Sequence, residues 1–241
     1  DDCSSRGLGD VYKRQKESNM KISNEIINIF PEIKNWRHEL HAHPELGYEE
    51  EWTSNFVAKK LESFGLEIHR GMAKTGVVGV LKGANASLGG GGNKAIGLRA
   101  DMDALPMTEE NDFSYKSKFD GRMHACGHDG HTAMLLGAAK LLSSKKDFDG
   151  TVYFIFQPAE EGGGGGLTMI EDGLFQQFPM DSVWGMHNWP GMSEGSVAVH
   201  KGSVMAAADK FEVTINGNGG HAAMPQACLL YTSDAADELS C

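Results

Sequence analysis

The chain has 241 residues, of which 40% are hydrophobic, so it is long enough for one large or two ordinary domains with a buried core. It carries 33 acidic and 22 basic residues, and the net charge of −11 argues against nucleic acid or an anionic membrane as a partner. No apolar run approaches the roughly 20 residues of a membrane span, and the N-terminal residues have no signal-peptide pattern. We expect a cytoplasmic protein that acts on a small molecule.

Both ends of the chain differ in character from its body. Residues 1–15 have no apolar periodicity, whereas apolar residues recur at helical spacing from Met20 onward. Residues 229–241 follow a strongly patterned segment without a turn or stop signal. We expect 1–15 to be a non-native leader and 229–241 a non-native tail, so that part of the native fold is missing beyond Cys228.

The first predicted elements are two helices and three short strands. The first helix has apolar residues at helical spacing and can start a turn at Pro31, and the second, over residues 49–65, closes at Gly65. Runs rich in β-formers follow at three places: 66–70, 76–83 and 95–105. Two helices therefore precede the first strands of a sheet.

The next elements alternate between helix and strand. Residues 131–144 predict a helix that is apolar on nearly all sides and hence buried. The continuous apolar strand 151–156 follows, and a further strand is expected at 181–187. This alternation predicts an α/β fold, a largely buried β-sheet flanked by helices, over residues 16–204.

The pattern changes after Gly195. Residues 195–200 and 209–217 alternate apolar and polar side chains as strands do, with no helix between them. We therefore expect a second, smaller module to begin near residue 205, of which the chain carries residues 205–228.

The most concentrated chemistry lies in the stretch MHACGHDGHT, residues 123–132. Cys126 and His128 are separated by a single glycine, which permits the tight turn that lets a thiolate and an imidazole bind one metal ion. The other three cysteines lie near the chain ends, so no disulfide framework holds the body and Cys126 is free for chemistry. Two alternatives stay open: a buried cysteine beside a surface histidine, and a cysteine nucleophile with a histidine base.

Two further motifs place candidate metal ligands at the ends of strands. Glu160 and Glu161 follow a buried strand, and Pro158 and the glycines beyond permit a turn in which one carboxylate binds metal and the other acts as a base. His187 ends another apolar strand. Each motif alone has a simpler explanation, a solvated acidic turn or a core histidine. Open α/β sheets bind their ligands at the carboxyl ends of strands, so the motifs together predict a metal site.

Six stretches, taken together, resemble the M20 metallopeptidases: RHELHAHPELGYEE, GLRADMDALPM, MHACGHDGHTAMLLGAA, FQPAEEGGGG, GMHNWPG and GGHAAMP. The most similar branch is the amidohydrolases that cleave N-acyl amino acids, including hippurate hydrolases and auxin-conjugate hydrolases. The resemblance covers residues 22–228 in the right order. It implies a catalytic α/β domain that carries two divalent metal ions about 3.5–4 Å apart, interrupted by a smaller α+β lid domain that often forms a dimer.

The resemblance also implies roles for individual side chains. Four would be metal ligands: Cys126, His128, Glu161 and His187. Glu160 would be the general base, and His221 of the lid motif would help to bind the substrate. Supporting roles, on the protein or the substrate side of the site, fall to Asp101, Asp103, His124 and His131. One more ligand, a histidine far downstream, is expected beyond the end of this chain.

The implied reaction is hydrolysis of the amide bond of an N-acyl amino acid, which releases a carboxylic acid and a free amino acid. Two cations would lower the pKa of water toward roughly 7, and Glu160 would carry its proton to the leaving amine. The mixed donor set suits manganese or zinc, with cobalt and nickel as alternatives. A homodimer through the lid is expected at full length. Two other hypotheses stay open: a non-enzymatic metal-binding module, and a fragment that is inactive because its site is incomplete.

Overall fold

The computed structural model describes residues 22–84, 94–199, 201–202 and 211–214. The chain divides into two units, Lys16–Glu194 and the remainder, and every helix and strand named here belongs to the first. In chain order these elements are α2 (Asn24–His41), α3 (Glu51–Ser63), β1 (Glu67–Met72), β2 (Gly76–Lys82), β3 (Ala95–Asp101), α4 (His128–Lys145), β4 (Thr151–Gln157), α5 (Gly165–Glu171), α6 (Leu174–Gln177) and β5 (Ser182–Gly185).

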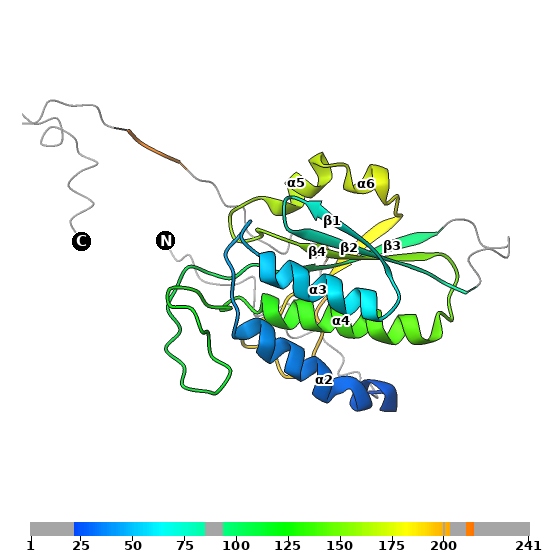
Figure 1. The fold of residues 1–241 in the computed structure, drawn as a ribbon, viewed down its shortest axis with the longest axis horizontal. Coiled ribbons are helices and arrows are strands. Elements are labelled where there is room, and N and C mark those ends of the chain that lie inside the picture. The colour runs from blue at the N-terminus through cyan, green and yellow to red at the C-terminus, as the bar shows by residue number, and fades with distance from the viewer. Residues whose placement is uncertain (1–21, 85–93, 200, 203–210, 215–241) are drawn as a thin grey trace, which may run out of the picture. The chain divides into compact units, whose positions relative to one another are not determined.

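The strands form one mixed sheet in the order β1-β2-β4-β3-β5 (Figure 1). β2 runs antiparallel to both β1 and β4, whereas β3 runs parallel to both β4 and β5. The register pairs Asp101 of β3 with Gln157 of β4, and Arg99 of β3 with Gly185 of β5. The carboxyl ends of the three parallel strands therefore lie at one edge of the sheet, where α/β proteins bind their ligands.

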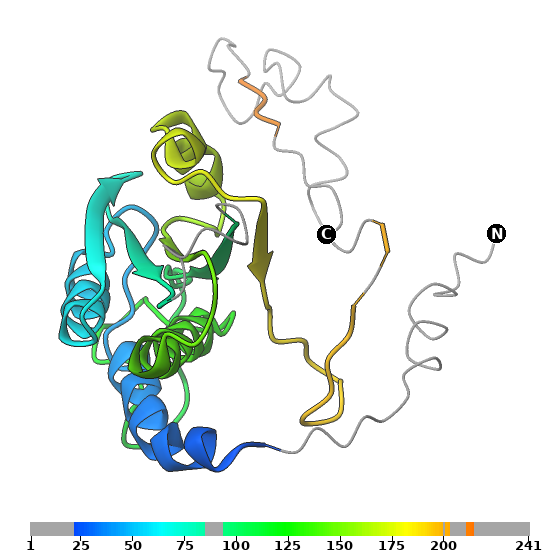
Figure 2. The ribbon, with the colours of Figure 1, turned by 90° about the vertical axis from the view of Figure 1, so that its right-hand side faces the viewer.

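Helices cover both faces of the sheet, with α2, α3 and α4 on one side and α5 and α6 on the other (Figure 1 and Figure 2). Phe154 and Phe156 of β4 belong to the core under α2, α3 and α4, whereas Ile155 packs with Met169 and Leu174 on the opposite face. Successive side chains of a strand point to opposite faces, so a strand covered on both sides is apolar throughout. The α/β prediction with a buried, helix-flanked sheet is confirmed.

The first helix starts earlier than the proline suggested. Ser23 caps α2, because its Oγ accepts a hydrogen bond from the Ile26 amide at 3.4 Å, and Pro31 lies inside the helix rather than at its start. Only the second half of α2 is deeply buried, with Trp36 2% exposed and Ile26 44% exposed. α4 begins at His128, three residues before the predicted helix, so the helix itself carries a candidate ligand.

Three predicted strands differ from the structure. The strand expected at 181–187 is the short edge strand β5, and its Trp184 is 63% exposed, so the sheet is not buried at this edge. The strand expected at 195–200 is absent over 195–199, and residues 211–214 of the next one are also not in a strand. Neither of these described segments belongs to the five-stranded sheet. The predicted module boundary at residue 205 lies outside the described residues.

Two short helices, α5 and α6, follow the glycine run after β4 and were not predicted. Among the residues that the structure describes, no helix is both long enough and apolar enough to cross a membrane.

Candidate metal centre

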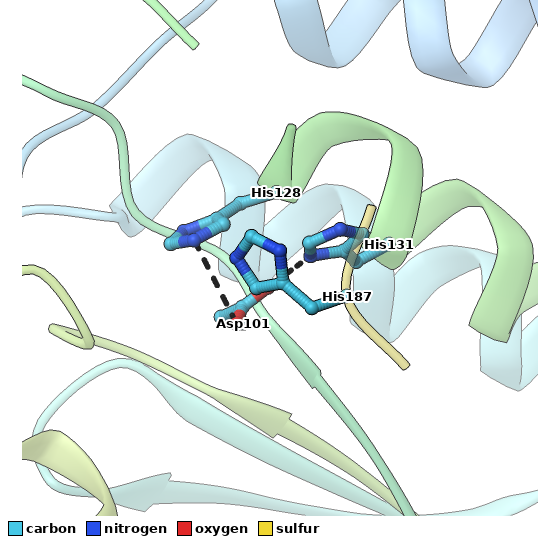
Figure 3. A group of neighbouring side chains, drawn as sticks. All are labelled: Asp101, His128, His131 and His187. Atoms are coloured by element: carbon cyan, nitrogen blue, oxygen red, sulfur yellow. Dashed lines mark hydrogen bonds and ion pairs between the residues drawn. The ribbon is translucent and has the colours of Figure 1, made fainter. Parts of the chain in front are cut away.

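The parallel strands bring the predicted site residues to one edge of the sheet. Each strand ends close to such residues: Asp101 and Asp103 at β3, Glu160 and Glu161 after β4, and His187 after β5. The N-terminus of α4 adds Cys126 and His128 to the same place. Figure 3 shows four of these side chains turned toward one another: Asp101, His128, His131 and His187. The four candidate ligands and the candidate base predicted from the sequence thus lie together.

The turn between Cys126 and His128 depends on glycine. Gly127 precedes α4 with φ of 93°, a left-handed conformation that other residues rarely adopt. A Cβ on Gly127 would also lie 2.4 Å from Oδ1 of Asn188, which is too close for any side chain. The turn therefore brings the Cys-Gly-His segment against the segment that carries His187.

His128 has one ring nitrogen bound to the protein and one without a hydrogen-bond partner. The side chain is fully buried, and its Nδ1 lies 2.8 Å from the carbonyl oxygen of Asp103, to which it donates. Nε2 has no hydrogen-bond partner, although it is completely buried. A bond from Nδ1 to a carbonyl fixes the tautomer in which Nε2 can bind a metal ion.

Three carboxylates face this unpartnered nitrogen. The distances from His128 Nε2 are 3.7 Å to Oδ2 of Asp101, 3.8 Å to Oε2 of Glu160 and 3.8 Å to Oε1 of Glu161. These distances are too long for hydrogen bonds but are spacings that ligand atoms adopt around a shared cation, since each metal–ligand bond is about 2.0–2.2 Å. Burial lowers the pKa of His128, but the hydrogen bond to Asp103 and the charges of Asp101 and Glu161 outweigh it and raise the pKa, so the site attracts positive charge.

Two groups of potential ligands share His128. One contains Cys126, His128 and Glu161, and the other contains Asp101, His128, His131 and His187. Within each group the candidate ligand atoms all lie within 4.8 Å of one another. The groups also touch, since Sγ of Cys126 lies 3.4 Å from Nε2 of His187. Sulfur, nitrogen and oxygen donors at this spacing fit a metal centre.

Cys126 lies in an environment that favours the neutral thiol. Burial raises its pKa to about 12, and the nearby carboxylates of Glu161 and Glu160 act in the same direction. A nucleophilic cysteine needs the opposite environment, in which positive charge stabilises the thiolate. The burial and negative charge around Cys126 therefore disfavour the cysteine-nucleophile alternative and suit a thiol that loses its proton only when its sulfur binds a metal ion.

The Glu160–Glu161 turn is held by two buried carboxylates. Ala159 has φ of 51°, and its amide donates to Oε1 of Glu50 at 2.8 Å. The Glu161 amide donates to Oδ2 of Asp103, also at 2.8 Å. The backbone thus leaves strand geometry directly after β4, as the sequence predicted, and both glutamates approach His128.

Glu50 is a supporting residue that the sequence analysis missed. It is fully buried, and besides the Ala159 amide it accepts a hydrogen bond from the Thr75 hydroxyl at 2.6 Å. Burial raises its pKa, and these hydrogen bonds only partly oppose the shift. No local pattern marks Glu50, because its partners lie 25 and 109 residues away along the chain.

Asp101 is held as a carboxylate at the end of β3. Its Oδ2 accepts from Nη1 of Arg99 at 2.7 Å, and its Oδ1 lies 2.7 Å from Nδ1 of His131. Burial by itself would raise its pKa, but the His131 hydrogen bond and the charges of His128 and Arg99 lower it to about 2. Asp101 therefore contributes a full negative charge to the site.

His124 is not part of either ligand group. It is only 5% exposed, neither of its ring nitrogens has a hydrogen-bond partner, and burial lowers its pKa to about 4. His221, the predicted substrate-binding residue, lies outside the described residues.

The fold and this arrangement define a mixed α/β protein with a candidate metal centre at the carboxyl edge of its parallel strands. Residues 97–240 match peptidase family M20/M25/M40, so the chain belongs to that family. The resemblance found in the sequence motifs is thereby confirmed.

The relatives include enzymes named for their action on acylated amino acids. The chain is 48% identical over 207 residues to a hippurate hydrolase of Campylobacter jejuni, covering 86% of this chain and 52% of that protein. It is 46% identical over 208 residues to an N-acyl-L-amino acid amidohydrolase of Geobacillus stearothermophilus, covering 83% and 54%. The chain therefore spans about half the length of these curated relatives.

Among solved structures, the fold matches a dinuclear metal-binding peptidase of the M20 family from Bacillus subtilis. The TM-score is 0.63 and the identity 40%, over 68% of this chain and 45% of that one.

Proposed function

We propose that the whole protein hydrolyses the amide bond of N-acyl amino acids at a centre of two divalent metal ions. The observation that carries the proposal is Nε2 of His128, which is buried, has no hydrogen-bond partner and faces three carboxylates. The substrate class rests on the relatives, which include a hippurate hydrolase and an N-acyl-L-amino acid amidohydrolase. The dinuclear peptidase of similar fold supports the number of ions.

The ions would be held by residues that the fold brings together: Cys126, His128, Glu161 and His187. When bound, such ions lower the pKa of water and polarise the carbonyl group of the scissile amide. Zinc or manganese suits this mixed set of sulfur, nitrogen and oxygen donors, with cobalt and nickel as alternatives.

Glu160 is proposed as the general base. Its side chain is 35% exposed, and its Oε2 is 3.8 Å from the buried nitrogen of His128. In this position one oxygen can accept a proton from the attacking water while the group stays accessible to the substrate. The same carboxyl group then donates that proton to the leaving amine nitrogen.

Three further parts of the proposal lie outside the described residues: the substrate-binding histidine of the lid, the dimer and one more metal ligand. His221 would bind the substrate from a lid domain beginning near residue 205, and the lid would join two copies into a homodimer. A further histidine ligand would come from the part of the relatives' length that this chain does not span.

A Glu160→Gln substitution in the full-length protein tests the proposal. The amide keeps the size of the side chain but cannot accept a proton, so hydrolysis of N-acetyl and N-benzoyl amino acids should fall about 100- to 10,000-fold. Metal content, measured by elemental analysis, should stay the same. Glu171→Gln, at an exposed position at the end of α5, is the matched control and should leave both values unchanged.

The alternative of a non-enzymatic metal-binding module predicts a different result. Such a module would bind metal without hydrolysing any acyl amino acid, and Glu160→Gln would change nothing. Normal hydrolysis by the variant would instead show that Glu160 is not the base.

A further inference from the structure

His131 lies among the candidate ligands but both of its ring nitrogens are already used. Nδ1 lies 2.7 Å from Oδ1 of Asp101, and Nε2 accepts a hydrogen bond from the amide of Asn188 at 3.0 Å. Oδ1 of the Asn188 side chain lies 2.7 Å from the same Nε2 and accepts from it when that nitrogen carries a proton, so Asn188 occupies Nε2 in either protonation state of the ring. Each imidazole nitrogen offers a single in-plane position for a partner. His131, which is 3% exposed, therefore has no lone pair left to direct at a metal ion.

Asn188 connects His131 to the candidate ligand His187. Nδ1 of His187 donates to the carbonyl oxygen of Asn188 at 2.7 Å, which leaves its Nε2 directed at Sγ of Cys126, 3.4 Å away. The same asparagine packs on Gly127, whose missing side chain makes room for it. One residue thus links α4, the Cys-Gly-His turn and the loop after β5.

The chain of contacts begins in the sheet. Arg99 fixes Asp101, Asp101 fixes His131, and the ring of His131 holds the Asn188 backbone. His187 needs such an anchor, because it is exposed and lies two residues beyond the four-residue edge strand β5. In many metal sites the histidine of such a carboxylate–histidine pair is itself the metal ligand. Here the pair Asp101–His131 holds Asn188, and Asn188 in turn orients the candidate ligand His187.

We propose that His131 is a positioning residue, not a ligand, and that through Asn188 it fixes the position and tautomer of the metal ligand His187. The inference rests on the proposed metal centre and extends it. It separates the group Asp101, His128, His131 and His187 into residues that bind metal and residues that hold them.

Histidine tautomers and metal coordination can be read directly by NMR on the 241-residue chain. Long-range ¹H–¹⁵N correlation reports which nitrogen of each ring is protonated, and binding of ¹¹³Cd²⁺ as the probe metal gives ¹⁵N–¹¹³Cd coupling only at ligand nitrogens. We expect coupling at His128 and His187, none at His131, and protonation of His187 at Nδ1 before metal is added.

The variant His131→Phe keeps the volume of the ring and removes both hydrogen bonds. The fraction of His187 that is protonated at Nδ1 should fall. The affinity for Cd²⁺ should fall about 10- to 100-fold relative to the unaltered chain, with the same number of ions bound. His124→Phe is the matched control, because His124 is equally buried but makes no hydrogen bond through its ring. It should leave the His187 tautomer unchanged.

The outcomes separate this inference from the proposed function. Coupling of ¹¹³Cd to His131 would make it a ligand and overturn the inference while leaving the metal centre intact. An unchanged His187 tautomer in His131→Phe would also overturn it. Absence of coupling at every histidine would overturn the metal centre and the inference together. If His131→Phe does not fold, the tautomers and couplings of the unaltered chain still decide whether His131 binds metal.

Discussion

Two buried histidines at the ends of α2 and α4 differ in one respect. His41 is bonded at both ring nitrogens, to Oδ2 of Asp129 at 2.8 Å and to Oε1 of Glu109 at 3.0 Å. His128 is bonded at Nδ1 only, and carboxylates surround its Nε2 at 3.7–3.8 Å. Both have raised pKa values, although burial acts in the opposite direction. Both ring nitrogens of His41 are thus occupied by hydrogen bonds, whereas Nε2 of His128 remains available to a cation.

The two sites are neighbours in the fold, since Asp129 directly follows His128 in the first turn of α4. Arg37 of α2 also donates to Oδ2 of Asp129 at 3.0 Å. Asp129 therefore attaches the start of α4 to α2 through His41 and Arg37. Because both ring nitrogens of His41 are bonded and Nε2 of His128 has no hydrogen-bond partner, substitutions at the two histidines should have different consequences.

The largest effect on stability is expected from His41→Phe. This change leaves Asp129 and Glu109, both nearly fully buried, without their shared partner. Breaking a buried ion pair costs about 3–5 kcal/mol, so the free energy of unfolding in urea should fall by about that amount. His69→Phe, which removes a histidine paired with Glu67 on the surface, should cost about 1 kcal/mol or less. Equal losses for the two variants would show that the buried carboxylate bonds of His41 stabilise the fold no more than a surface ion pair does.

Adding zinc should stabilise the chain by binding to the unpartnered Nε2 of His128. A ligand at 100 times its dissociation constant raises the free energy of unfolding by about 2.7 kcal/mol, because it binds only the folded state. His128→Phe should abolish this gain, which can be followed by thermal unfolding with and without a chelator. His41→Phe should retain it, if enough of the variant folds, since its ring does not face the centre.

The free energy of unfolding should depend on pH through the protonation of His41. The pKa of His41 is raised above its ordinary value of 6.5, because the Asp129 and Glu109 hydrogen bonds outweigh burial. Above pH 6.5 the unfolded chain has lost this proton while the folded chain keeps it. The stabilisation is therefore complete below 6.5 and is lost as pH rises through the folded pKa, with a slope of at most about 1.4 kcal/mol per unit. In metal-free protein, His41→Phe should flatten this part of the curve, and an unchanged slope would show that another group titrates there.

The smallest effect is expected from Arg37→Ala. The Arg37 side chain is 42% exposed, so water screens its ion pair with Asp129, which keeps its bond to His41. The loss in free energy of unfolding should be about 1 kcal/mol or less. A loss as large as that of His41→Phe would mean that the arginine, not the histidine, holds the start of α4.

Much of the fold and the candidate site follows from local patterns in the sequence. Helical periodicity and apolar runs predict α3, α4 and the central strands, because each element buries a face that its own residues define. The motifs that carry Cys126, His128, Glu161 and His187 stand at strand ends, so the topology of parallel strands is enough to predict their meeting. The extent of α2, the exposure of β5 and the two short helices could not be predicted, because they depend on neighbours rather than on the segment itself.

What the sequence alone determined is the set of chemical groups and the edge of the sheet at which they gather. Only the tertiary structure decided which groups are free to bind. His128 and His131 are three residues apart on one helix, yet Asp103 leaves a nitrogen of the first open while Asp101 and Asn188 occupy both nitrogens of the second. Those partners lie 25 to 57 residues away along the chain, so only folding brings them to the two rings and gives the rings different hydrogen-bond partners.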